Sequence, residues 1–126
     1  MTDGPDTVNA LGAKVNAWAE AEVERWLAKG KIVGLLGGDH ASPYGAIAAM
    51  AARHPGMGLL HIDAHADLRE AYEGLTWSHA SIMWNVATRL PNVARLVQVG
   101  IRDVGEAEVE FARGSDGRIV TWFEPE

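Results

Sequence analysis

Apolar residues follow two different rhythms along this chain. Over residues 8–29 they recur mostly every three or four positions among charged side chains, which is the spacing of an amphipathic helix, and Gly30 is a natural stop. Elsewhere they form short continuous runs bounded by glycine, proline or polar residues, and such runs are typical of buried strands. The pattern predicts helices at 8–29, 44–53, 82–89 and 103–113, alternating with strands at 31–36, 58–62, 95–101 and 118–123.

This alternation of helices with apolar strands predicts an α/β fold. Strands that are apolar throughout are usually covered on both faces, so we expect a three-layer αβα sandwich with a mostly parallel sheet. No internal repeat, low-complexity tract or linker divides the 126 residues, and 48% of them are hydrophobic, enough for a real core. We therefore expect residues 1–126 to form a single domain or part of one.

The charge balance narrows the class of partners. The net charge is -6, with 17 acidic against 11 basic residues, and no basic cluster follows any segment, which argues against a nucleic-acid surface. The absence of cysteine excludes disulfides and thiolate metal sites and fits a reducing compartment. Residues 1–5 do not begin a secretory signal, and no apolar run is long enough to span a membrane. We expect a cytoplasmic protein without a membrane partner.

The densest candidate chemistry follows the second predicted strand. Asp63, His65 and Asp67 alternate with alanines directly after the apolar run 58–62. In an extended strand, residues at this spacing point to one face, so two carboxylates and an imidazole would converge in apolar surroundings. Charges gathered there are costly unless a cation holds them. Because carboxylate and imidazole suit Mn, Zn, Fe or Ni, the triplet predicts a metal site.

Further motifs fall near the predicted ends of the strands. Residues 37–40 (Gly-Gly-Asp-His) follow the first strand, 100–103 (Gly-Ile-Arg-Asp) end the third, and 78–81 (Ser-His-Ala-Ser) lie in the loop after the second. In open α/β sheets ligands bind beyond the carboxyl ends of strands, so we expect these motifs to share one site. Each motif taken alone is also explained as a tight turn, a helix cap or a local ion pair. His61 precedes the triplet on the same face by alternation and is an alternative fourth ligand, but we interpret it as a polar residue packed within or at the rim of the strand layer and do not count it among the ligands.

Read in order, GGDH at 37–40, DAHAD at 63–67 and SHAS at 78–81 resemble the motifs of the ureohydrolase superfamily of arginases and agmatinases. The DAHAD motif matches fully, whereas Ala41 stands where that family usually has serine. The resemblance covers about residues 31–103, and the Ser-His-Ala-Ser segment looks closer to agmatinase-like members than to arginase proper. It implies a hydrolase that cleaves a guanidino or amidino group of a small substrate and releases urea.

The resemblance further implies a binuclear manganese site, with Ni, Zn or Fe as alternatives to Mn²⁺. His40, Asp63 and Asp67 would serve one ion, and His65 would serve the other, with Asp63 bridging the two. Two ions this close can hold a shared hydroxide that attacks the guanidinium carbon near neutral pH. His79 matches the family's histidine that shuttles a proton to the leaving amine, so the implied catalytic residues are His79 and Asp63.

The sequence also departs from the family pattern. The family has a later Asp-x-Asp-x-x-Asp-Pro motif with two more ligands, whereas the only aspartates after Asp67 here are Asp103 and Asp116, outside that pattern. We therefore expect a partial ureohydrolase domain, truncated at both ends. Two functions stay open: the urea-releasing hydrolase, and a truncated, non-catalytic metal-binding fragment or pseudoenzyme. The GGDH and DAHAD pair disfavours a third, a deacetylase on the related fold.

Two further expectations concern specificity and assembly. In this family the loop at 68–77 would face the substrate tail, where Arg69 suits a carboxylate and Glu70 or Glu73 suits an amine. A solvated charged loop explains these residues equally well. A sheet of about four strands leaves an uncovered edge, so we expect a marginal monomer that self-associates as a homo-oligomer or aggregates.

Overall fold

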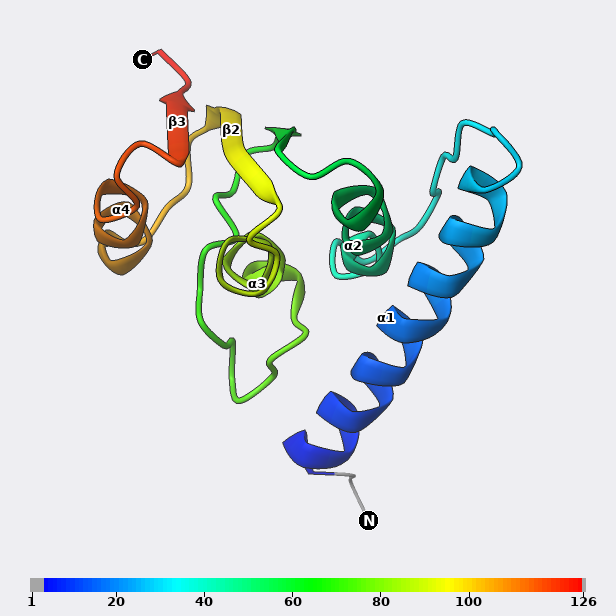
Figure 1. The fold of residues 1–126 in the computed structure, drawn as a ribbon. Coiled ribbons are helices and arrows are strands. Elements are labelled where there is room, and N and C mark those ends of the chain that lie inside the picture. The colour runs from blue at the N-terminus through cyan, green and yellow to red at the C-terminus, as the bar shows by residue number, and fades with distance from the viewer. Residues whose placement is uncertain (1–3, 126) are drawn as a thin grey trace.

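The computed structural model describes residues 4–125 of the chain, which fold into helices packed beside a small sheet (Figure 1). The elements in chain order are α1 (Pro5–Leu27), α2 (Tyr44–Arg53), β1 (Met57–Ile62), a short 3₁₀ helix η1 (His79–Ser81), α3 (Ile82–Arg89), β2 (Val93–Ile101), α4 (Glu106–Arg113) and β3 (Ile119–Phe123). Every predicted helix is present. The last begins at Glu106 rather than 103, because the Glu108 carboxylate accepts from the backbone N–H of Gly105 and so caps it there.

The sheet is parallel, in the order β1-β2-β3, with β2 at its centre. Each step from one strand to the next passes through a helix: α3 lies between β1 and β2, and α4 between β2 and β3. Parallel neighbours require such crossovers, which the alternating pattern predicted. The α/β class with a parallel sheet is therefore confirmed.

The predicted strand at 31–36 is wrong. Residues 31–37 are part of the irregular connection between α1 and α2 (the cyan connection in Figure 1) and belong to no strand in the described part of the chain. Ile32 and Leu36 are fully exposed. An apolar run has the propensity for a strand, but a strand exists only when its backbone N–H and C=O groups bond to a neighbour. Among the described residues no backbone hydrogen bond joins this segment to a strand of the sheet, so the predicted strand does not form.

The core lies between the sheet and the helices on one side of it. Figure 1 shows α2, α3 and α4 on the same side of the strands. Inner residues of α2 and α3, inward residues of β2 and β3 and two residues of the connection after β1 form one buried cluster, against which α4 packs: Ile47, Ala51, Ala66, Leu68, Ile82, Met83, Val86, Val93, Leu96, Ile101 and Ile119. Burial of this apolar surface is the main stabilising term of the fold.

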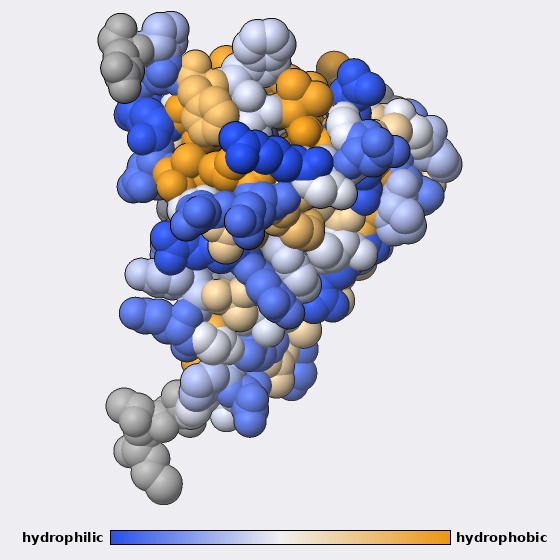
Figure 2. Space-filling model, turned by 90° about the vertical axis from the view of Figure 1, so that its left-hand side faces the viewer, coloured by the Kyte–Doolittle hydropathy of each residue, from blue (hydrophilic) through white to orange (hydrophobic). Residues whose placement is uncertain are grey.

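The opposite side of the sheet is exposed in the described residues. We define the open sheet face as Leu60, Ile62, Val99 and Trp122, which are 62%, 75%, 38% and 63% exposed. Ile62, Val99 and Trp122 are register partners on the three strands and therefore form a continuous apolar row. Figure 2, which looks onto the α4 and β3 side, shows hydrophobic surface concentrated where the sheet lies.

The long helix α1 packs on α2, where Ala19 of α1 lies against Gly45 of α2. Its buried positions are Asn16, Ala19, Val23 and Leu27, whereas Leu11, Val15 and Trp18 of its apolar pattern are exposed. The helical spacing was therefore predictive of the helix but not of the face that is buried. No helix among residues 4–125 has the length and apolar character needed to cross a bilayer.

Candidate metal centre

The centre lies at the carboxyl end of β1, where the strand gives way to a turn. β1 ends at Ile62, so the strand-like alternation predicted through the triplet is wrong from Asp63 onward. The Oδ1 of Asp63 accepts from the backbone N–H of His65 at 2.9 Å, and Asp67 has a left-handed backbone (φ 53°). Aspartate tolerates both geometries because its short side chain bonds its own backbone and it enters the left-handed region more readily than most residues.

Backbone hydrogen bonds anchor this turn to the neighbouring elements. The carbonyl of Ala64 accepts from the N–H groups of Arg102 and Asp103 beyond β2, at 2.9 and 3.0 Å. The carbonyl of Asp67 accepts from Met83 and Trp84 in the first turn of α3. These bonds satisfy N–H groups at a helix start that lacks a side-chain cap. The turn is therefore held in place by β2 and α3 together.

Four side chains converge here: His40, His61, Asp63 and Asp67, each with a ligand-type atom within 4.8 Å of the others. The Nδ1 of His40 lies 2.6 Å from the Oδ2 of Asp67 and 3.5 Å from the Oδ2 of Asp63. The Nε2 of His61 lies 3.3 Å from the same Asp63 oxygen. The rings of His40 and His61 stack with centroids 5.3 Å apart. Residues from both the GGDH and the DAHAD motif thus meet in one cluster.

His65 lies outside this group of four and on the other side of Asp63. Its Nδ1 is 3.4 Å from the Oδ1 of Asp63, and its Nε2 is 3.6 Å from the Oδ2 of Asp103. The two carboxylate oxygens of Asp63 therefore face different histidines, Oδ2 toward His40 and His61 and Oδ1 toward His65. His65 is also 59% exposed, whereas Asp67 is buried.

The ionisation of the cluster follows from these contacts. The hydrogen bond to Asp67 raises the pKa of His40 more than burial lowers it. Burial lowers the pKa of His61 and outweighs the hydrogen bond to Asp63, which raises it. Burial alone would raise the pKa of Asp63, but the hydrogen bonds from the backbone of His65 and the ring of His61 leave it lowered. Asp63 is thus an anion near neutral pH, and His61 is neutral.

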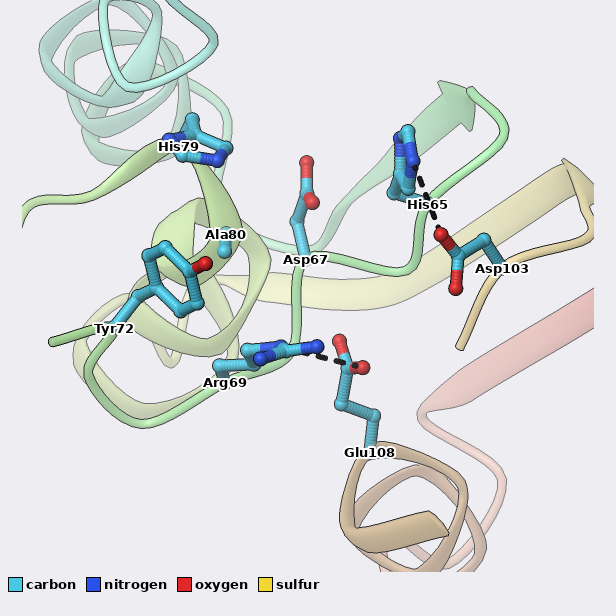
Figure 3. Close-up of a pocket in the computed structure, with 8 residues that line it drawn as sticks. All are labelled: His65, Asp67, Arg69, Tyr72, His79, Ala80, Asp103 and Glu108. Atoms are coloured by element: carbon cyan, nitrogen blue, oxygen red, sulfur yellow. Dashed lines mark ion pairs between the residues drawn. The ribbon is translucent and has the colours of Figure 1, made fainter. Parts of the chain in front are cut away.

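A cavity of about 160 Å³ opens beside the cluster, and Figure 3 shows the residues that line it: His65, Asp67, Arg69, Tyr72, His79, Ala80, Asp103 and Glu108. In that view Asp67 lies between His79 on one side and His65 with Asp103 on the other. The guanidinium of Arg69 lies 3.8 Å from the Glu108 carboxylate and over the ring of Tyr72. Three carboxylates face one arginine, so the lining is acidic and suits a cationic ligand.

His79 reaches this cavity from the start of η1. Ser78 caps that turn through its Oγ, which accepts from the backbone N–H of Ala80 at 3.1 Å. His79 is exposed and meets the ring of Tyr72 edge-on at 5.7 Å. The structure thus brings His79 to the same cavity as Asp67 and His65, although the three come from separate turns.

Sequence reasoning placed His61 on the same face as the triplet but did not predict its place in the cluster. We interpreted it as packing, yet it joins the group of four, while His65 does not. Its signal was its position two residues before Asp63 in a strand, which puts both side chains on one face. Gln98 was missed as well; an amide inside the apolar run of β2 was the available sign. Both are buried and both contact the turn.

Comparisons with known proteins agree on one family. A family model described as the arginase family matches residues 3–124. The chain is 37% identical over 105 residues to an agmatinase of Halalkalibacterium halodurans, covering 83% of this chain and 36% of the relative. It is 40% identical over 93 residues to an N(1)-aminopropylagmatine ureohydrolase of Thermus thermophilus, covering 73% and 30%.

The fold has solved counterparts too. The crystal structure of an arginase from Bacillus cereus superposes with a TM-score of 0.76 at 25% identity, covering 87% of this chain and 43% of that one. The chain spans about a third of the length of the curated relatives quoted above (36% and 30%). The matched part contains the GGDH, DAHAD and SHAS motifs at residues 37–40, 63–67 and 78–81.

Proposed function

This chain belongs to the arginase family, and from that premise we propose that it carries the metal-binding part of a hydrolase acting on a guanidino or amidino group. The observation that carries the proposal is the meeting of His40, Asp63 and Asp67 beside a cavity that also receives His79. We propose residues 1–126 as a single partial domain with the family's first two metal motifs.

The donor set fits divalent transition metals. Imidazole and carboxylate ligands suit Mn, Zn, Fe and Ni, and no thiolate is available because the chain has no cysteine. We propose that His40, Asp63 and Asp67 hold one ion and that His65, with Asp63 between, holds a second. The two oxygens of Asp63 facing opposite histidines support this division. When bound, such ions supply nucleophilic water near neutral pH by lowering its pKa.

The chain's own residues perform the remaining steps. The carboxylates that line the cavity attract a guanidinium and hold it beside the metal cluster. His79 carries the proton that the leaving nitrogen needs, because an imidazole positioned beside the substrate can act as a general acid. Tyr72 stacks edge-on against that imidazole and restricts its orientation. We favour an agmatinase-like activity on an agmatine-type substrate, because both curated relatives quoted above are named for agmatine-type compounds.

A second function rests on a specific observation. The aspartates that follow Asp67 are Asp103 and Asp116; Asp103 is 79% exposed and Asp116 lies in the turn after α4. With fewer carboxylates than the family site, the chain on its own would bind a single ion and release no urea. This is the non-catalytic metal-binding fragment or pseudoenzyme.

Metal stoichiometry after Mn²⁺ loading separates the two functions. For the hydrolase we expect two bound ions per chain, and we expect Asp63→Asn to weaken the binding of both. We also expect urea release from agmatine, arginine or a guanidino acid. Asp116→Asn is the matched control, since it makes the same change in a turn remote from the cluster. One ion per chain without urea release would favour the non-catalytic fragment. No specific binding would exclude both.

A further inference from the structure

A buried amide sits at the centre of the sheet. Gln98 lies in the middle strand β2 and is fully buried. Its register partners are His61 on β1 and Thr121 on β3, so three polar side chains lie in one row across an otherwise apolar layer. Buried polar groups are costly unless they are bonded, so the row must be satisfied internally. Its hydrogen bonds can be assigned one by one.

The backbone decides which way the amide points. The shortest hydrogen bond of the Gln98 side chain is with the carbonyl oxygen of Ala66, at 2.6 Å, and a carbonyl can only accept. The Gln98 atom facing it is therefore the Nε2, which donates. The Oε1 then faces Thr121, whose hydroxyl donates to it at 3.0 Å. The second N–H of the amide points at the Nδ1 of His61, at 3.0 Å.

This orientation determines the state of the His61 ring. Because Gln98 donates to the Nδ1, that nitrogen carries no proton, and a neutral imidazole then carries its proton on Nε2. The Nε2 lies 3.3 Å from the Oδ2 of Asp63, so His61 donates to that carboxylate. A nitrogen that carries a proton has no lone pair for a metal. His61 therefore belongs to the cluster by position but is not available as a ligand.

We propose that Gln98 fixes His61 as the Nε2–H tautomer, which makes His61 a positioning residue that holds Asp63 rather than a fifth ligand of the centre. The role of His61 toward a metal rests on the proposed function, whereas the assignment of its tautomer does not. Through Ala66, the same amide also holds the turn that carries His65 and Asp67. One side chain thus sets both the orientation of Asp63 and the path of the ligand turn. Hydrogen bonds of this kind orient ligands and tune the affinity of a metal site.

The tautomer can be tested in the metal-free full chain by ¹⁵N NMR of its imidazole rings. We expect His61 to show a directly bonded proton on Nε2 and none on Nδ1. Gln98→Met keeps a similar volume but removes both donors, so the preference for the Nε2–H tautomer should weaken, because only the 3.3 Å bond to Asp63 then favours it. Thr121→Val is the matched control. It removes the hydroxyl that donates to the Gln98 Oε1 but leaves both N–H donors of the amide in place, so the tautomer of His61 should not change. A proton on Nδ1 in the wild type would overturn the assignment.

Titration with Zn²⁺, a diamagnetic probe, tests the role of His61 toward the metal. We expect the His61 Nε2 to keep its proton while the signals of His40 change, and Gln98→Met to weaken Zn²⁺ binding about tenfold. Loss of the Nε2 proton on loading would make His61 a ligand and refute the proposal. A chain that binds no Zn²⁺ yet shows the Nε2–H tautomer would exclude the proposed function and support the hydrogen-bond assignment.

Discussion

Among the individual residues, His40 determines how the metal-free protein responds to pH. The hydrogen bond with Asp67 raises the pKa of His40 in the folded state. Folding therefore favours the protonated ring, so this stabilisation is fully present below the unfolded pKa of about 6.5 and is lost as the pH rises through the folded pKa. We expect the difference in free energy of unfolding between wild type and His40→Gln to be greatest below that range and to shrink above it.

Urea denaturation in the presence of a chelator, repeated across this pH range, measures the difference. His54→Gln is the control, since His54 is an exposed histidine at the end of α2. A difference that grew with rising pH would show that the His40 ring is held neutral and that the pair with Asp67 is not an ion pair. The same proton competes with a metal, so the pH that favours the metal-free pair disfavours metal binding.

At the level of the elements, α1 and α2 approach each other closely at Gly45. A Cβ placed there would overlap the backbone oxygen of Asn16 and lie 2.8 Å from the backbone nitrogen of Glu20. Backbone atoms of a helix cannot rotate away, so Gly45→Ala must push the helices apart despite the better helix propensity of alanine. We expect the free energy of unfolding to fall by about 1–3 kcal/mol.

The measurement is urea denaturation monitored by far-UV circular dichroism. Gly34→Ala is the matched control, because a Cβ at that position meets nothing within 4 Å. Equal stability of the Gly45 and Gly34 variants would mean that α1 does not pack on α2 in solution as it does here.

The elements themselves were largely predictable because their signals are local. Helical spacing over 44–53 and the apolar run 58–62 reappear as α2 and β1 to within a residue. The run 31–36 carried an equally strong strand signal and formed no strand, since pairing depends on a partner distant in sequence. The triplet shows the same limit. Its residues were identifiable, but the turn at Asp63 and the left-handed Asp67 are set by bonds to β2 and α3.

For the whole molecule, the open sheet face is the feature that we expect to govern self-association in solution. Leu60 and Trp122 are 62% and 63% exposed on it, beside the unpaired edges of β1 and β3. Exposed apolar surface and free edges both promote association. We expect the protein to self-associate as its concentration rises, and Leu60→Lys with Trp122→Lys to shift it toward monomer, as measured by sedimentation velocity.

The comparison variant is Leu11→Lys with Trp18→Lys, which adds the same two charges at exposed apolar residues of α1. It should leave the association unchanged if the open sheet face is responsible. A wild-type chain that stays monomeric at every concentration would contradict the expectation and show that the three-stranded sheet is self-sufficient.

The sequence by itself determined the α/β class, the family and the identity of the candidate ligands, because spacing and motif are properties of neighbouring residues. Only the tertiary structure decided which of them meet. His40 and Asp67 are 27 positions apart, and His61 and Gln98 are 37 apart, yet each pair is in hydrogen-bond contact. Such contacts arise when strands pair and helices pack, and the free energy of that packing belongs to the whole chain. For this reason His61 enters the cluster, His65 lies to one side, and Gln98 acquires a role that no local pattern could assign.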